Sequence, residues 1–163
     1  MKHLILALAA LFLTSTAEAA TVWAYRIEPA SMISGGKLKI IDLGNGAGYK
    51  KLRFKYKLET AAGYKENGLP YNLPGKVFDP KFLASLVPGE AVDLGNVPHG
   101  WENKTERFQI VRESQAAYMI SSSAGNFRIY PRNKGGAWKR IEFTIRSGVT
   151  LRLNGNLEEV VRE

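Results

Sequence analysis

The chain has 163 residues, with 23 Lys and Arg against 15 Asp and Glu, a formal net charge of +8 and no cysteine. The absence of cysteine excludes disulfides and cysteine-ligated metal sites, and a chain of this length can bury a core without them. The excess of positive charge favours an acidic partner.

Residues 1–19 have the three parts of a secretory signal peptide. Residues 2–3 are basic, residues 4–13 are uninterrupted apolar positions, and small side chains precede a cleavage site after Ala19. A helix that spans a membrane needs about 20 apolar residues, so the apolar run is too short to be an anchor, and no later segment approaches that length. We therefore expect cleavage after Ala19, which leaves residues 20–163 as a single domain without a transmembrane segment.

An exported chain without cysteine is more typical of bacteria than of a eukaryotic secretory pathway. We therefore expect a protein that is free in the bacterial periplasm or in the medium. Export argues against nucleic acid as the partner of a basic surface. The remaining acidic partners are lipid headgroups, cell-envelope polymers and acidic proteins, and the sequence leaves the oligomeric state open.

Most of the remaining sequence alternates with the period of two that half-buried strands show. Two early runs around a Gly- and Asn-rich break predict a hairpin, and the later runs predict a meander. Asn154-Gly155 is the strongest turn signal, because both central residues of a type I′ turn need a positive φ. The expected strands cover residues 22–27, 37–43, 49–59, 106–112, 117–121, 126–130, 138–146, 149–153 and 157–161.

Two segments interrupt this alternation. Residues 60–78 contain two prolines and an Asn-Gly pair without a steady period, which predicts a long irregular loop. Residues 79–87 predict a short helix, because Asp79 can cap its first amides and Pro80 suits its first position. About nine strands and one helix predict an all-β domain, an antiparallel β-sandwich, with a small closed β-barrel as the alternative.

Residues 49–59 carry a row of cations on one side of the expected strand: Lys51, Arg53, Lys55 and Lys57. Neighbours in this row are about 7 Å apart and repel by roughly 0.6 kcal/mol in water, so the row needs no ligand to exist. Acidic residues on an adjacent strand would neutralise it, or the lysines would protect an edge strand. The functional interpretation is an anion-binding face, which the shortage of acidic residues favours.

Residues 130–140 form a second basic cluster, built from Arg132, Lys134, Trp138 and Arg140. Arginine can bind phosphate or carboxylate through two parallel hydrogen bonds, and an aromatic ring can stack on a flat group. This combination suits a phosphorylated glycan, a lipid headgroup or an acidic peptide. The structural alternative is an ordinary hairpin tip with a half-buried Trp138.

Residues that suggest catalysis are few. His99 is the one histidine after the expected cleavage site, and it could form an acid–base pair with Glu102. The sequence has no nucleophile elbow, no metal-binding helix and no phosphate-cradling loop, so we predict no catalytic residue, metal or cofactor. His99 is interpreted as a turn residue, with a small hydrolase as the alternative. Trp101 suggests either an exposed recognition residue or a cover for one end of the fold.

Together these observations predict an exported, non-catalytic binding module that recognises an acidic envelope partner through a basic face. The alternative is a structural or assembly subunit of a bacterial envelope complex that pairs through its β-edges.

Overall fold

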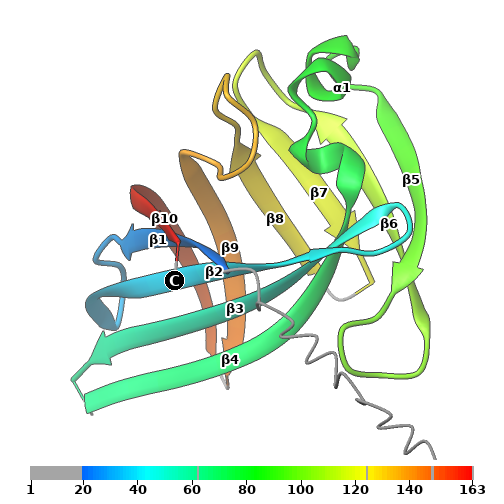
Figure 1. Cartoon of the computed structure of the whole chain (residues 1–163). Helices are drawn as coiled ribbons and strands as arrows, with labels where there is room; N and C mark the ends of the chain where they lie inside the picture. Colours follow the sequence, from blue (N-terminus) through cyan, green and yellow to red (C-terminus); the bar gives the residue numbers. More distant parts are fainter. Residues whose placement is uncertain (1–19, 62, 124, 148, 163) are drawn as a thin grey trace, which may run out of the picture.

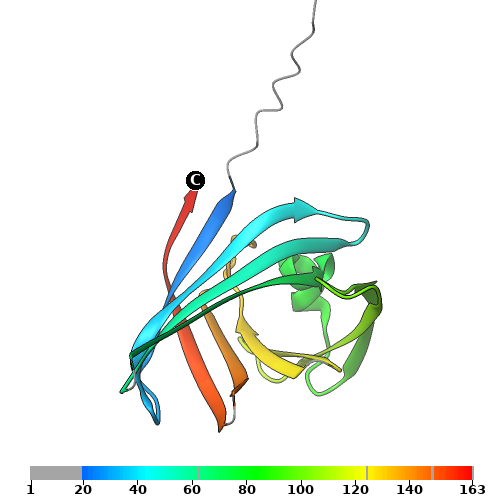
Figure 2. The ribbon, with the colours of Figure 1, turned by 90° about the horizontal axis from the view of Figure 1, so that it is seen from below.

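The structure, a computed structural model, describes residues 20–61, 63–123, 125–147 and 149–162. In this part of the chain ten strands form one antiparallel sheet that curls until it is nearly closed into a barrel (Figure 1). Figure 2 shows the strands curving around a common interior, with the helical segment inside the outline of the sheet. None of the helices described is long and apolar enough to span a membrane.

The strands are β1 (Thr21–Ile27), β2 (Ile33–Asn45), β3 (Tyr49–Thr60), β4 (Gly63–Pro74), β5 (Ala91–Pro98), β6 (Thr105–Arg112), β7 (Tyr118–Ser122), β8 (Gly125–Tyr130), β9 (Arg140–Ser147) and β10 (Val149–Arg162). A 3₁₀ turn, η1 (Gly75–Phe78), and a short helix, α1 (Pro80–Ser85), connect β4 to β5. The strand order is β4-β3-β2-β1-β10-β9-β8-β7-β6-β5, so β4 and β5 are the two edges.

The predicted all-β, antiparallel architecture is confirmed. Because β1 pairs with both β2 and β10, the early strands and the later meander belong to one sheet. The single curled sheet corresponds to the barrel alternative rather than to two facing sheets. The predicted hairpin is also present, as β2 and β3 around the Gly-rich break at residues 46–48.

The predicted helix is confirmed as α1. The Asp79 carboxylate accepts a hydrogen bond from the backbone N–H of Lys81 at 2.9 Å, and Pro80 occupies the first helical position. Both features satisfy or remove N–H groups that the first turn leaves without a partner.

The irregular loop expected over residues 60–78 is wrong, because residues 63–74 form strand β4. Pro70 lies within this strand, opposite Arg53 of β3. Proline removes a donor from one side of a strand, and an edge strand needs no donor on its outer side. The position of β4 at the edge of the sheet explains why its prolines are tolerated.

The turn expected at Asn154-Gly155 is also wrong, because β10 runs through both residues without a break. Gly155 pairs with Ile27 of β1 and Ile141 of β9. A Cβ atom at Gly155 would lie 3.3 Å from the Tyr25 Cβ atom. Gly155 is therefore needed for the room that it leaves for the Tyr25 side chain in the barrel interior, and not for a positive φ.

Inward-facing side chains fill the interior, and η1, α1 and the segment 131–139 close one end of it. Trp138 stacks on Phe78 with ring centroids 5.2 Å apart and an interplanar angle of 9°. Trp23 meets both rings at 5.8 Å. This aromatic packing anchors the connection between β4 and β5 to the end of the barrel.

Candidate anion-binding face

The cations of β3 lie on the outside of the barrel. Lys51, Arg53, Lys55 and Lys57 are all exposed, whereas Leu52 and Leu58, on the opposite face of the strand, are buried in the core. The alternation of residues 49–59 therefore assigned the two faces correctly.

Strand β2 adds two lysines that the sequence analysis did not include. Lys39 lies directly opposite Lys55, and Lys37 lies directly opposite Lys57. Both additional lysines are exposed on the same outer face. The signal was the Lys-Leu-Lys alternation at residues 37–39, which becomes informative only when the register of the β2–β3 hairpin is known.

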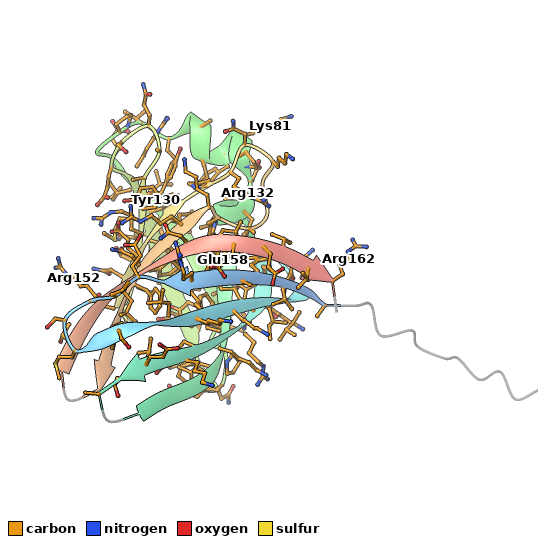
Figure 3. The ribbon with its side chains drawn as sticks, turned by 90° about the vertical axis from the view of Figure 1, so that its left-hand side faces the viewer. Lys81, Tyr130, Arg132, Arg152, Glu158 and Arg162 are labelled. Atoms are coloured by element: carbon orange, nitrogen blue, oxygen red, sulfur yellow. The ribbon has the colours of Figure 1, made fainter. Side chains whose placement is uncertain are left out.

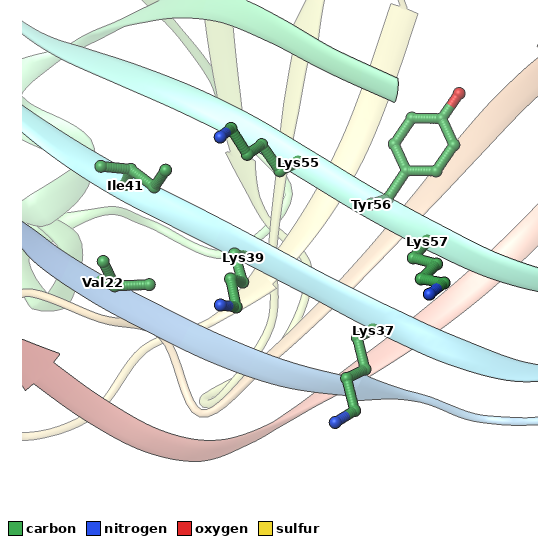
Figure 4. A pocket seen from close by; sticks show the side chains of 7 residues that line it. All are labelled: Val22, Lys37, Lys39, Ile41, Lys55, Tyr56 and Lys57. Atoms are coloured by element: carbon green, nitrogen blue, oxygen red, sulfur yellow. The ribbon is translucent and has the colours of Figure 1, made fainter. Parts of the chain in front are cut away.

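The lysines surround a groove of about 320 Å³ on the outer face of β1, β2 and β3 (Figure 4). The groove is lined by Val22, Lys37, Lys39, Ile41, Lys55, Tyr56 and Lys57. Val22 of β1 and Ile41 of β2 are paired in the register and lie at one end of it, beyond the level of Lys39 and Lys55 (Figure 4). We call it the lysine groove.

Neither structural explanation accounts for Lys51, Arg53 and Lys55. Strand β3 lies between β2 and β4, so it is not an edge strand. On the β4 side, the register places Asn72, Pro70 and Gly68 opposite Lys51, Arg53 and Lys55. Glu66 is the one acidic residue of β4 in this register, and it lies opposite Lys57. Lys57 takes part in a further interaction.

The side chains of Lys37, Lys39 and Lys55 form no salt bridge or hydrogen bond with any residue that the structure describes. On the neighbouring strands, Arg26 of β1 forms an ion pair with Glu158 of β10 at 3.8 Å. The positive charge of the lysine groove is therefore incompletely neutralised within the described part of the chain.

The second basic cluster does not form a comparable surface. Trp138 is 1% exposed and packs in the core, so the expectation of a solvent-facing ring there is wrong. The Arg132 side chain donates a hydrogen bond to the backbone oxygen of Ala137 at 2.9 Å. Arg140 forms an ion pair with Glu142 at 3.1 Å and lies over the Tyr130 ring. Lys134 alone of the four predicted residues is fully exposed.

The wall formed by β8 and β9 balances its charges, in contrast to the lysine groove. Arg128 forms ion pairs with both Glu113 and Glu142, and the Tyr130 hydroxyl donates to Glu142 at 3.0 Å. Burial acts to raise the pKa of Glu142, but hydrogen bonds from Arg128 and Tyr130 outweigh it and hold the pKa below its usual value.

The two predicted clusters lie on different walls of the barrel. Strands β1 and β10 separate β2 and β3 from β9 and β8 in the sheet. Arg132 and Tyr130 lie toward the end of the barrel that α1 covers (Figure 3). The predicted binding residues therefore divide into the β3 row, which gains Lys37 and Lys39, and a separate group tied to its own acidic and aromatic neighbours.

His99 is built into the connection between β5 and β6. Its Nδ1 atom accepts hydrogen bonds from the backbone N–H groups of Glu102 at 3.1 Å and Trp101 at 3.4 Å. Its Nε2 atom lies 4.0 Å from the buried Glu106 carboxylate, and the 53% exposed Trp101 packs edge-on against the imidazole. These contacts agree with the interpretation of His99 as a turn residue, and the hydrolase alternative stays a prediction.

Among the described residues, no group of three or more His, Cys, Asp or Glu side chains is placed to hold a metal ion. Comparisons with protein-family models, curated proteins and solved structures find no match to this chain.

Proposed function

We propose that the protein is an exported, non-catalytic binding module that captures an anionic partner in the lysine groove. The observation that carries this proposal is the pairing of like charges across β2 and β3. Lys39 faces Lys55, and Lys37 faces Lys57, at adjacent positions on the same outer face.

The pairing of Lys39 with Lys55 is unfavourable in the protein alone. Like charges directly opposite each other destabilise an antiparallel pair, and two unit charges about 6 Å apart repel by roughly 0.7 kcal/mol in water. On the β8–β9 wall of the same barrel, Arg128 and Arg140 each have a carboxylate partner. A sheet that balances its charges on one wall and concentrates cations on another is suited to attract an anion there.

The chemistry of the groove supports binding rather than a reaction. Lysine ammonium groups donate several hydrogen bonds to an anionic oxygen and attract it electrostatically. The other lining residues are Val22, Ile41 and Tyr56. If the chain is exported as predicted, the anionic partner is an envelope component: a lipid headgroup, a cell-envelope polymer or an acidic protein.

The test is binding to anionic phosphatidylglycerol vesicles and to bacterial envelope fragments, from about 50 mM to about 500 mM salt. We expect binding to fall steeply with salt and to be abolished in a Lys39→Glu/Lys55→Glu variant. The matched control is Lys81→Glu/Lys134→Glu, which changes the net charge equally at two exposed positions outside the groove. Salt-independent binding, or equal losses in both variants, would contradict the proposal.

A second candidate function is assembly through the β-edges. The sheet ends at β4 and β5, and where these edges approach, the Asn72 side chain donates to the Pro98 backbone oxygen at 2.9 Å. An added strand could use the remaining edge hydrogen-bonding groups. Light scattering separates the two functions: a concentration-dependent oligomer, unchanged in the Lys39→Glu/Lys55→Glu variant, would favour assembly.

A further inference from the structure

We infer that the lysine groove binds a linear polyol phosphate polymer, in which phosphodiesters alternate with three-carbon spacers. This inference rests on the proposed function and names the chemical class of its ligand. Three features of the groove carry it: the spacing of its cations, its width and the apolar side chain at one end.

The cations are spaced as the phosphates of such a polymer are. Lys37 and Lys39 are two residues apart on β2, as are Lys55 and Lys57 on β3, and this step spans about 6.6–6.8 Å. Two residues of extended backbone contain six covalent bonds. Six bonds also join the phosphorus atoms across a three-carbon spacer (P–O–C–C–C–O–P), so an extended chain has a similar repeat.

At one level of the groove, Lys39 and Lys55 offer two ammonium groups to one phosphate. Directly opposite residues have Cβ atoms roughly 4.5–5.5 Å apart, and lysine side chains are long enough to converge on an anion between them. Lys39 and Lys55 form one level, and Lys37 lies at the next level opposite Lys57. The phosphate contacts are assigned to Lys37, Lys39 and Lys55, because Lys57 takes part in a further interaction. Arg53 continues the row along β3.

The width of the groove favours a slim chain that carries charge on its own backbone. The two rows of lysines stand on hydrogen-bonded neighbouring strands, about 4.8 Å apart. An acidic polypeptide carries its carboxylates on side-chain stalks, so its backbone would lie above the rows. A membrane surface is flat on this scale and would touch only the rims of the groove.

One end of the groove suits a spacer. Val22 and Ile41 lie side by side at that end (Figure 4). Ile41, which is partly exposed, lies opposite Arg53 and two residues from Lys39 on β2. A methylene spacer between one phosphate at Lys39 and Lys55 and the next at Arg53 can contact Ile41, whereas a nucleic acid would need platforms for its bases to stack on.

The first experiment compares three small probes by titration of the protein's backbone amide NMR signals: propane-1,3-diol bisphosphate, pyrophosphate and inorganic phosphate. The first probe has the inferred spacing, and pyrophosphate has similar charge on adjacent phosphorus atoms. We expect shifts confined to β1, β2 and β3, with a Kd for the spaced bisphosphate at least about 10-fold lower than for pyrophosphate. Equal affinities, or shifts centred on another wall, would overturn the inference.

The second experiment compares polymers. We expect poly(glycerol phosphate) to bind more tightly than poly-L-glutamate, single-stranded oligothymidylate or phosphatidylglycerol vesicles, at equal concentration of charge and equal salt. Lys39→Gln and Lys55→Gln should each weaken this binding by about 10-fold, whereas Lys81→Gln and Lys134→Gln should change it less than about 2-fold. Retained thermal unfolding in all four variants shows that the fold is intact.

These outcomes distinguish a wrong ligand class from a wrong proposed function. If another polyanion binds the groove as tightly as poly(glycerol phosphate), the ligand class is wrong and the proposed function stands. If no anion perturbs β1, β2 or β3, both are wrong.

Discussion

Lys39 on β2 lies directly opposite Lys55 on β3, and both side chains are exposed on the outer face of the barrel. A pair of this kind lowers the stability of the protein without ligand, because neither ammonium group has a described partner that would offset the repulsion. The same pair is the centre of the proposed binding surface. Stability and binding should therefore respond to its charge in opposite directions.

The substitution Lys55→Glu should stabilise the fold and impair binding. It replaces a like-charged pair with an ion pair, and we expect the free energy of unfolding to rise by about 0.5–1.5 kcal/mol at low salt. Urea unfolding measures this gain, which should shrink as salt screens the charges. Polyanion binding should fall in the same variant.

Lys81→Glu on α1 is the control for that change, since it alters the net charge equally at an exposed position away from the groove. Its effect on the free energy of unfolding should stay within about 0.5 kcal/mol. A Lys55→Glu variant that unfolds more easily than the unmodified protein would show that the lysine pair is not a source of strain.

Gly155 should not tolerate a larger side chain. A Cβ atom there would lie 3.3 Å from atoms of Tyr25 and Ile141, and the further methyl groups of valine would overpack the interior. We expect Gly155→Val to lower the free energy of unfolding by about 1–3 kcal/mol, measured by urea unfolding. Gly68→Val, on edge strand β4, is the control and should be close to neutral, because a Cβ atom there would lie 3.4 Å from the flexible Lys55 stem and 4.0 Å from the Phe54 backbone oxygen. If both variants are neutral, Gly155 does not occupy a packed interior position.

Tyr71 should make the protein sensitive to alkaline conditions. Burial raises the pKa of Tyr71 from 10.0 to about 12, although a hydrogen bond involving Ser122 acts in the opposite direction. Above pH 10 the unfolded chain releases this proton and the folded chain retains it. The contribution of Tyr71 to the free energy of unfolding is therefore fully present below pH 10. It falls between pH 10 and 12, by up to about 1.4 kcal/mol per pH unit.

Urea unfolding as a function of pH measures this loss, with tyrosinate absorbance reporting the titration. Tyr71→Phe should reduce the slope between pH 10 and 12, while the loss of its hydrogen bond costs about 1 kcal/mol near pH 7. An unchanged slope in Tyr71→Phe would assign the alkaline loss to other groups, such as the buried Tyr25, whose pKa is also raised by burial.

Trp138 should be a structural residue of the barrel end. Its ring stacks on Phe78 and contacts Trp23, so Trp138→Leu should lower the free energy of unfolding by about 2–4 kcal/mol. Lys134→Ala, in the same connection but exposed, should change it by less than about 0.5 kcal/mol. Thermal or urea unfolding measures both. A stable Trp138→Leu variant with reduced anion binding would show instead that the ring is part of a binding surface.

Local pattern was enough to predict the all-β class, the hairpin at residues 37–59, the helix with its Asp79 cap and the outward direction of the β3 cations. Each depends on neighbouring residues, either through alternation or through the chemistry of a cap. The same logic predicted a turn at Asn154-Gly155, where the Tyr25 side chain on another strand requires a residue without a side chain. Tyr25, which is distant in the sequence, therefore determined the conformation at Asn154-Gly155.

At the site, too, the local sequence predicts some features, and others depend on residues that are distant in the sequence. Lys55 could be placed on the outer face from its own strand, but its partner Lys39 depends on strand register. Trp138 lies among polar and glycine residues, and its burial depends on Phe78, which arrives from the connection between β4 and β5. Likewise, Pro70 led to the prediction of a loop where the structure has a strand. A proline is tolerated in β4 because this strand has no neighbour on one side.

The pairing of β1 with β10 has a consequence for biosynthesis. Thr21 pairs with Arg162, so the ladder between β1 and β10 joins two segments that are far apart in the sequence. Contacts of such wide sequence separation form at a high entropic cost. A nascent chain in which β10 has not yet been synthesised therefore exposes one side of β1, and the ten-stranded sheet is complete only after β10 has emerged from the ribosome.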